Sequence, residues 1–131
     1  MMSIIVISSD AERIHMALMM AASASAMGKK VAMFFSKGGV KAVTKGGWQE
    51  LTASCGTSAN DMDKNLEAVG VADFDILVDA LSALDIKFYV CDSAMAEHGL
   101  DILDLISRPQ VKVTGLASLI EYGSGGDWLT F

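Results

Sequence analysis

Five short runs of β-branched and aromatic residues alternate with helix-like segments, and this alternation limits the possible folds more than any other feature. The runs are Ser3–Ser8, Lys30–Ser36, Ile86–Cys91, Val111–Thr114 and Trp128–Phe131. Strands separated by helices imply right-handed βαβ crossovers, and the resulting parallel sheet is covered on both faces. The 131 residues also match the usual size of one domain. The sequence therefore predicts a single α/β domain over 1–131, with a mainly parallel sheet of about five strands.

The first helix is expected to begin after Ser9 or Asp10 and to end at Gly28, and it carries two apolar stripes. One stripe consists of Ile14, Ala17, Leu18 and Ala21, and the other of Met16, Met19, Met20 and Met27. A helix that is apolar on two faces is expected to be covered on both. The methionines are interpreted either as core filler or as the contact with another subunit.

Further along, Phe74, Leu77, Val78, Leu81 and Leu84 recur at helical spacing behind Asp73, a predicted cap. Short helices are expected from Asp92 to His98, after Asp101, and over Leu116–Tyr122. The segment 48–60 has few periodic apolar positions. We expect that segment to be an irregular or mobile loop.

Charge and cysteine content exclude several classes of protein. The formal net charge is −6, and a nucleic-acid-binding protein normally shows a basic excess instead. Two cysteines are too few for a secreted disulfide scaffold. The uncharged stretch 16–27 lacks the flanks of a signal peptide and is too short to cross a bilayer. A cytoplasmic protein without membrane or nucleic-acid partners is predicted.

Cys91 is the main candidate for chemistry because it ends one predicted strand and directly precedes a helix. Ligands of parallel sheets bind beyond the carboxyl ends of the strands, which here include the loops after Ser8, Ser36 and Val90. Backbone N–H groups at a helix start favour the thiolate, so the thiol is expected to be exposed and to have a lowered pKa. Asp92 opposes this effect or caps the helix, and Ser93 joins the predicted pocket. The alternative is an inert buried cysteine.

A second candidate site is the glycine- and lysine-rich loop after the second strand. Lys37, Lys41 and Lys45 are spaced by four, so a helix would place them on one face. Together with Gly38 and Gly39, and with Ser8 from the first loop, Lys37 and Lys41 form a predicted anion-binding pocket. The loop does not match a P-loop, and a solvated lysine face is the alternative.

The remaining thiol and the two histidines suggest little chemistry. Cys55 lies in the predicted loop, and its Thr52-x-x-Cys55 spacing lacks the upstream proline of peroxiredoxins because Trp48 stands there. Cys55 is interpreted as a passive cysteine or as a possible second, resolving thiol for Cys91. His15 and His98 are interpreted as surface or cap residues, and no metal site or cofactor is predicted.

The run Ile86–Cys91 with Gly99 eight residues after the cysteine, together with Val111–Gly115 and the closing Asp127–Phe131, resembles the DsrE/DsrF-like family. The resemblance spans nearly the whole chain, although only the cysteine and its flanks are distinctive. It implies a three-layer α/β/α fold, assembly into a homo-oligomer such as a trimer or hexamer, and a cysteine that carries persulfide sulfur. By position, this cysteine is Cys91.

The sequence is compatible with three functions. The leading hypothesis is a sulfur-handling protein, sulfurtransferase-like if it is an enzyme, in which Cys91 relays persulfide sulfur between a donor and an acceptor protein. The second is a non-catalytic oligomeric module that binds a small anion or nucleotide through the loop after the second strand. The third is a structural subunit that recruits a partner and performs no chemistry.

Overall fold

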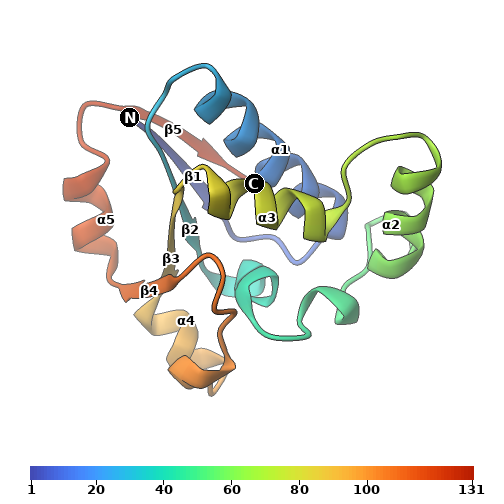
Figure 1. Ribbon diagram of the computed structural model, residues 1–131. Helices are drawn as coiled ribbons and strands as arrows, with labels where there is room; N and C mark the ends of the chain where they lie inside the picture. Colours follow the sequence, from blue (N-terminus) through green and yellow to red (C-terminus); the bar gives the residue numbers. More distant parts are fainter.

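A computed structural model describes residues 1–131 and contains one five-stranded sheet (Figure 1). Its strands follow the order β4-β3-β2-β1-β5, and all four neighbouring pairs are parallel. The strands are β1 (Met2–Val6), β2 (Val31–Phe35), β3 (Lys87–Cys91), β4 (Val111–Thr114) and β5 (Asp127–Thr130). Each predicted strand is present within two residues of its expected bounds, and the predicted fold class is confirmed.

Five α-helices connect or follow the strands, and several begin at the cap that their sequence provides. They are α1 (Ala11–Ala26), α2 (Ala59–Ala68), α3 (Phe74–Ala83), α4 (Asp92–Glu97) and α5 (Leu116–Tyr122). Asp10 caps α1 by accepting from the Glu12 N–H, and Asp73 caps α3 by accepting from the Ile76 N–H. These side chains satisfy amide groups that the first helical turn leaves unpaired.

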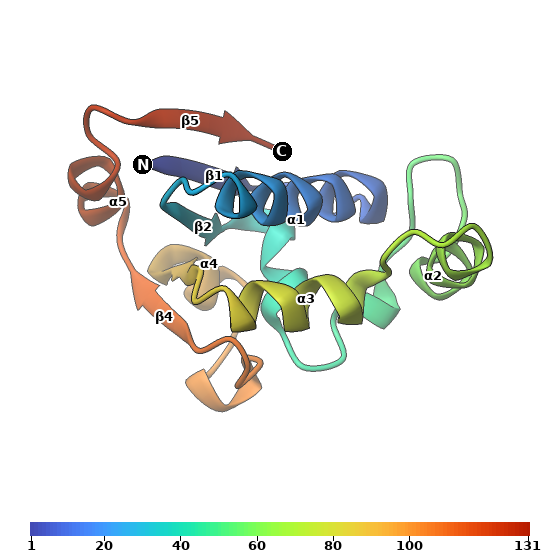
Figure 2. The same cartoon turned by 45° about the horizontal axis from the view of Figure 1, so that its top comes forward.

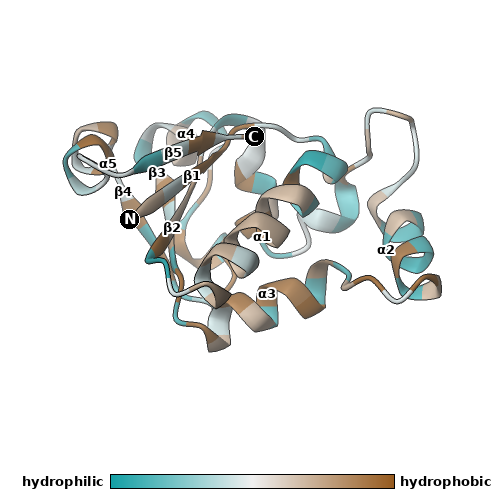
Figure 3. Ribbon diagram, turned by 90° about the horizontal axis from the view of Figure 1, so that it is seen from above, coloured by the Kyte–Doolittle hydropathy of each residue, from teal (hydrophilic) through white to brown (hydrophobic).

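The helices form the outer layers of a three-layer arrangement, but the two layers are unequal (Figures 1 and 2). Helices α1 and α3 lie against one face of the sheet, and Figure 3 shows brown apolar residues along both. Strand residues that point to this face include Ile4, Val6, Met33, Phe35 and Val90, all at most 1% exposed. The main core therefore lies between the sheet and the α1–α3 pair.

The opposite face carries a much smaller cluster. Phe34 and Cys91 from the strands pack there with Ala94 of α4 and Leu119 of α5. Because these short helices cover little area, apolar side chains remain exposed around them; they are Ile7, Leu116, Ile120, Tyr122 and Trp128. This second face of the sheet is thinly covered.

The segment 37–68 differs most from expectation. A 3₁₀ helix spans Lys37–Val43, and a second spans Trp48–Glu50. Helix α2 lies where the sequence analysis predicts no helix. The prediction of an irregular or mobile loop over 48–60 is therefore wrong around Trp48, which is only 2% exposed. Its ring stacks on Phe74 at 4.2 Å, and its Nε1–H donates to Asp63 at 2.7 Å.

One expectation for α1 also needs correction, and the two interpretations of its methionine stripe can be compared with the structure. His15 is not a surface residue: it is 7% exposed, and its Nε2 lies 2.8 Å from the Ala72 carbonyl oxygen, which brings the α2–α3 connection against α1. Met16 and Met27 are exposed, and Met19 and Met20 are only partly buried. The second methionine stripe is thus largely outside the core of this chain. None of the helices combines the length and apolar content needed to cross a lipid bilayer.

Candidate functional site

Cys91 is the last residue of β3 and the N-cap residue of α4, as its sequence position predicts. The parallel register pairs Phe35 with Val90 and Cys91 with Thr114. Alternation along the strands therefore turns Cys91 toward the second face, on the side of Phe34 and Tyr89. The residue lies at the carboxyl edge of the sheet, where ligands of parallel sheets bind.

The predicted exposure of Cys91 is wrong for the isolated chain. The residue is 1% exposed because Phe34, Ala94 and Leu119 surround its side chain. Its cover is nevertheless partly polar, since Sγ lies 2.9 Å from Oγ of Ser93, and Ser93 is itself exposed. The exposed side chains of Ser93 and Asp92 therefore stand beside the sulfur on its polar side.

The pKa of the Cys91 thiol is lowered, as predicted, but for reasons more specific than the start of a helix. Burial acts to raise this pKa, and hydrogen bonds to the sulfur outweigh it. The groups that lower this pKa, largest effect first, are the Ser93 hydroxyl, whose Oγ lies 2.9 Å from Sγ, the backbone of Ala94, the Ser36 hydroxyl and the backbone of Ser93. Hydrogen bonds of this kind stabilise the thiolate more than the thiol.

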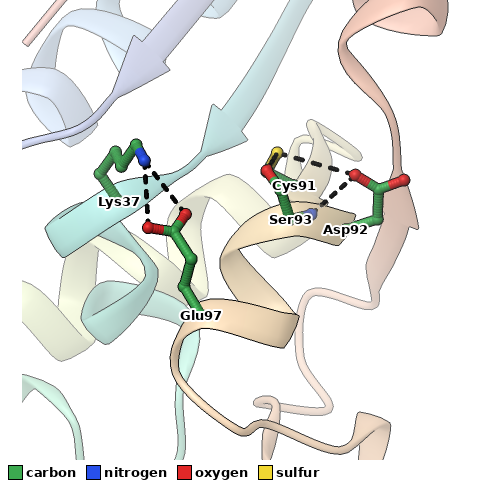
Figure 4. Close-up of polar contacts among 5 residues, drawn as sticks. All are labelled: Lys37, Cys91, Asp92, Ser93 and Glu97. Atoms are coloured by element: carbon green, nitrogen blue, oxygen red, sulfur yellow. Dashed lines mark hydrogen bonds and ion pairs between the residues drawn. The ribbon is translucent and has the colours of Figure 1, made fainter.

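Asp92 affects the sulfur less directly than its adjacent position suggests. One carboxylate oxygen, Oδ1, accepts from the Ser93 N–H at 2.7 Å and lies 3.9 Å from Sγ of Cys91 (Figure 4). The carboxylate thus bonds the N–H of the next residue, but the N-cap of α4 is Cys91 and no side chain caps this helix. Both predicted neighbours, Asp92 and Ser93, are brought together with Cys91.

Ser36 is a site residue that the sequence analysis missed. It follows β2 directly, and it is 8% exposed. The register that pairs Phe35 with Val90 places Ser36 next to Cys91 in the neighbouring strand. A strand alignment from the sequence alone would have indicated this neighbour, since both residues end their strands.

A small pocket adjoins the cysteine cluster on the second face. It has a volume of about 160 Å³ and is lined by Tyr89, Thr114, Ser118, Leu119 and Tyr122. Leu119 contacts the cluster of Cys91, and Thr114 is the strand partner of Cys91. The Tyr89 and Tyr122 rings meet edge to face at 5.9 Å and close one side. The pocket therefore lies beside the cysteine cluster, and Cys91 itself does not line it.

The lysines of the predicted anion pocket do not share one helix face. Lys37 Nζ lies 3.0 Å from a carboxylate oxygen of Glu97 on α4 (Figure 4), whereas Lys41 Nζ lies 2.6 Å from Glu50. The segment is a 3₁₀ helix, in which residues four apart point in different directions. The ammonium groups of Lys37 and Lys41 therefore each form an ion pair with a carboxylate of the same chain.

Ser8, Gly38 and Gly39 shape the ends of the first two strands. Ser8 Oγ accepts from the Asp10 N–H at 3.0 Å, next to the start of α1. A side chain on Gly39 would collide with the Val6 carbonyl oxygen, and one on Gly38 would meet Cβ of Ser9 at 2.9 Å. These glycines let the loop pass close to β1, which is a structural role.

Cys55 lies in an exposed turn between Ala53 and Ser58, and it is a free thiol like Cys91. The pKa of Cys55 is lowered, first by a hydrogen bond with the Thr57 hydroxyl and second by the backbone of Thr57. The adjacent Ser54 donates to Asp10, which fixes the turn at the start of α1. Cys55 is not among the residues that pack around Cys91.

Other candidate groups show no catalytic arrangement. His98 is exposed and forms the C-cap of α4. No three His, Cys, Asp or Glu side chains are gathered in a way that would hold a metal ion.

Solved structures with the same fold extend over nearly the whole chain. The ychN protein from E. coli has a TM-score of 0.69 at 16% identity, with 99% of this chain and 97% of that chain covered. MTH1491 from Methanobacterium thermoautotrophicum has a TM-score of 0.61 at 13% identity, covering 99% and 97%. BT1422 from Bacteroides thetaiotaomicron has a TM-score of 0.63 at 16% identity, covering 99% and 93%. The latter two are described as proteins of unknown function.

Comparison by sequence gives a family rather than a close relative. No curated protein matches this chain. The family model that matches is that of the DsrE/DsrF-like family, and the match covers residues 2–131. This range contains every strand of the sheet and the Cys91 site. The chain belongs to the DsrE/DsrF-like family.

Proposed function

We propose that the protein is a cytoplasmic sulfur-handling protein that carries a sulfur atom on Cys91 as a persulfide. Membership of the DsrE/DsrF-like family suggests a role related to sulfur relay. The observation that carries the proposal is the polar contact at the Cys91 sulfur, where Ser93 Oγ lies 2.9 Å from Sγ and the pKa of the thiol is lowered despite its burial. A lowered pKa favours the thiolate, which is the form that attacks sulfur.

The proposed step transfers a neutral sulfur atom between two proteins. The Cys91 thiolate attacks the outer sulfur of a persulfide on a donor protein, and a new S–S bond forms at Cys91. The S–S bond of the donor breaks, and the donor cysteine leaves as a thiolate. An acceptor thiolate then attacks the outer sulfur on Cys91 in the same way. No net oxidation occurs, and no metal or organic cofactor takes part.

Burial of Cys91 requires a local opening before this step. Ser93 is exposed and lies in the first turn of the six-residue helix α4, so a small movement there uncovers the sulfur. Short helices with few packed residues open at low cost in free energy. The donor protein is thus expected to approach over α4 and the second face.

A homo-oligomer, such as the trimer or hexamer that the family resemblance implies, is part of the proposal. Leu116 and Ile120 of α5 are 57% and 64% exposed, and Trp128 of β5 is 40% exposed. Apolar side chains gathered on one face are typical of a contact surface. A second copy of the chain against α5 would cover them.

Mass spectrometry after incubation with a small-molecule persulfide donor tests the function. The wild-type protein and the Cys55→Ser variant are expected to gain one sulfur atom on the peptide that contains Cys91. In the Cys91→Ser variant no sulfur is expected on that peptide, and any gain is confined to the exposed Cys55. Sulfur that appears on Cys55 alone, or on neither cysteine, contradicts the proposal.

The alternative, a non-catalytic module that binds an anion or nucleotide, is less well supported. Lys37 and Lys41, its predicted cations, form ion pairs with Glu97 and Glu50. An anion would have to displace a carboxylate from each lysine. An isotherm with inorganic phosphate separates the two functions, because anion binding is expected to weaken in Lys41→Ala and to persist in Cys91→Ser.

A further inference from the structure

The amino end of the sheet, opposite the Cys91 edge, gathers half of the basic side chains in the protein. Two adjoining pockets occupy this end, with volumes of about 160 and 300 Å³, and both are lined by Asp85, Ile86 and Lys87. Lys112 lines the smaller pocket, and Arg108 Nε lies 3.4 Å from Oγ of Ser82 in the same wall. The larger pocket adds Lys29 and Lys30. We call these five basic residues and the two pockets the basic end.

The charge of the basic end is opposite to that of the remaining protein. Its five cations are accompanied in the pockets by one carboxylate, Asp85, which gives a net charge of +4. The other residues carry five cations and fifteen carboxylates, a net charge of −10. Such a separation in a protein with excess acid produces a strong local field at the basic end.

Four of these five cations have no carboxylate partner within the chain. The one ion pair at the basic end joins Lys87 and Asp85 at 3.3 Å, and both side chains are well exposed. Lys29, Lys30, Arg108 and Lys112 are exposed and form no ion pair, although Glu121 and Asp127 lie on neighbouring elements. The unpaired charges are therefore available to an anionic partner.

The basic end also presents apolar surface between its charges. Leu84 and Tyr122 line the larger pocket and are 44% and 48% exposed, and Ile86 and Val31 form its floor. Pockets of this size are at or below the lower limit for small-molecule sites, about 300 Å³. The pattern of cations around exposed apolar side chains fits a peptide segment better than a compact ligand.

We propose that the basic end binds an acidic segment of a partner protein, with carboxylates facing the unpaired cations and an apolar side chain against Leu84 and Tyr122. A nucleic acid has charge along its whole length and would meet the surrounding net charge of −10, which repels it. A short acidic segment meets only the basic end. Tyr122 also lines the pocket beside the Cys91 cluster, but none of the five cations does, so variants of these cations test this proposal independently of the Cys91 site.

Fluorescence anisotropy with a labelled synthetic peptide tests the proposal. The peptide contains alternating glutamate and leucine residues, and a matched peptide has glutamine in place of glutamate. The acidic peptide is expected to bind the full-length protein and to bind more weakly as salt rises from about 50 to 300 mM. Equal affinity for the glutamine peptide, or no binding of either peptide, overturns the proposal.

Charge-reversal variants locate the binding surface. Lys30→Glu combined with Lys112→Glu is expected to weaken peptide binding about tenfold or more. Both side chains are exposed and form no hydrogen bond, so the variant is expected to fold. The matched control reverses Lys45 and Lys64, two exposed lysines outside the basic end, and is expected to change affinity less than about twofold. Equal weakening by both variants would mean that only total charge matters, which overturns the proposal.

Two further probes distinguish other anionic partners. A thymidine oligonucleotide and vesicles of phosphatidylcholine with phosphatidylserine are titrated under the same conditions. Tighter binding of either probe than of the acidic peptide, lost in the Lys30→Glu and Lys112→Glu variant, would assign the surface to nucleic acid or membrane and overturn the proposal. Cys91→Ser is expected to bind the peptide as the wild type does.

Discussion

Cys91 and Ser93 share a 2.9 Å contact between sulfur and hydroxyl oxygen, yet Cys91 is 1% exposed while Ser93 faces solvent. The serine hydroxyl lowers the pKa of the thiol more than any other group does, and it is also part of the cover of the sulfur. Replacing Ser93 is therefore expected to change two properties of Cys91: the pKa of its thiol and the accessibility of its sulfur.

Replacing Ser93 with alanine should raise the pKa of the Cys91 thiol, because the largest of the contacts that lower it is lost. The midpoint of the pH profile for alkylation by iodoacetamide, measured in a Cys55→Ser background, is expected to move to higher pH. Ser118→Ala is the control, since Ser118 lines the adjoining pocket without a bond to the sulfur. A midpoint that does not move in Ser93→Ala contradicts the assignment of Ser93 as a donor.

The two thiols should differ in how fast they are labelled. Both pKa values are lowered, but Cys55 is exposed and Cys91 is buried. At neutral pH we expect Cys55 to react first, and Cys91 to react at the slower rate of a local opening. Peptide mass spectrometry over time measures both rates. Dilute urea should speed up labelling at Cys91 alone, and equal rates without denaturant would show that the site is open.

Asp75 is expected to destabilise the protein at neutral pH. Burial and the neighbouring Asp73 and Asp63 carboxylates raise the pKa of Asp75 above 3.8. A raised carboxyl pKa contributes stability that is present below pH 3.8 and is lost as pH rises through the folded-state value. Asp75→Asn should thus raise Tm by about 1–2 °C at pH 7 and have little effect below pH 3.8. Glu121→Gln on α5 serves as the control, and a gain that does not depend on pH would contradict the electrostatic explanation.

Trp48 is expected to hold the segment 37–68 against α3. Trp48→Ala removes both the stack on Phe74 and the bond to Asp63, and should cost about 3–5 kcal/mol of the free energy of unfolding in urea. Trp48→Phe keeps an aromatic ring and removes only the N–H donor, so a loss of about 1–2 kcal/mol is expected. Similar losses in the two variants would show that the stacked ring contributes little.

Gly39 should tolerate no side chain. Its position against the Val6 carbonyl oxygen leaves no room for a methyl group, so Gly39→Ala is expected to cost more than about 2 kcal/mol in thermal or urea unfolding. Gly28→Ala is the comparison, because Gly28 has open space and a φ of +85°. The cost there should be about 1 kcal/mol. A Gly39→Ala protein as stable as Gly28→Ala would contradict the close approach of the loop to β1.

The strands and the apolar helices α1 and α3 were predictable because each is marked by a pattern within its own short stretch of sequence. β-branched runs mark the five strands, and the stripe from Ile14 to Ala21 marks α1. Helix α2 was missed because only Ala59 and Met62 of its ten residues are buried, so its apolar pattern is weak. Trp48 and His15 are buried by partners at positions 74 and 72, which are distant in sequence and were not identified as neighbours.

The candidate site was predictable in position but not in environment. The end of a strand followed by a helix placed Cys91 correctly, together with Asp92 and Ser93. Its burial depends on Leu119, which reaches the sulfur only because β4 and α5 return to this side of the sheet. The partners of Lys37 and Lys41 likewise follow from tertiary packing, at positions 97 and 50.

The unequal layers of the sheet have a consequence for how the protein meets others. Cys91 belongs to the thinly covered side, where exposed apolar residues also gather. A donor protein that reaches the sulfur from this side would contact the same surface that the proposed homo-oligomer would bury. Sulfur transfer and self-association would then compete for this surface, so the reaction rate of Cys91 should change when the protein is diluted.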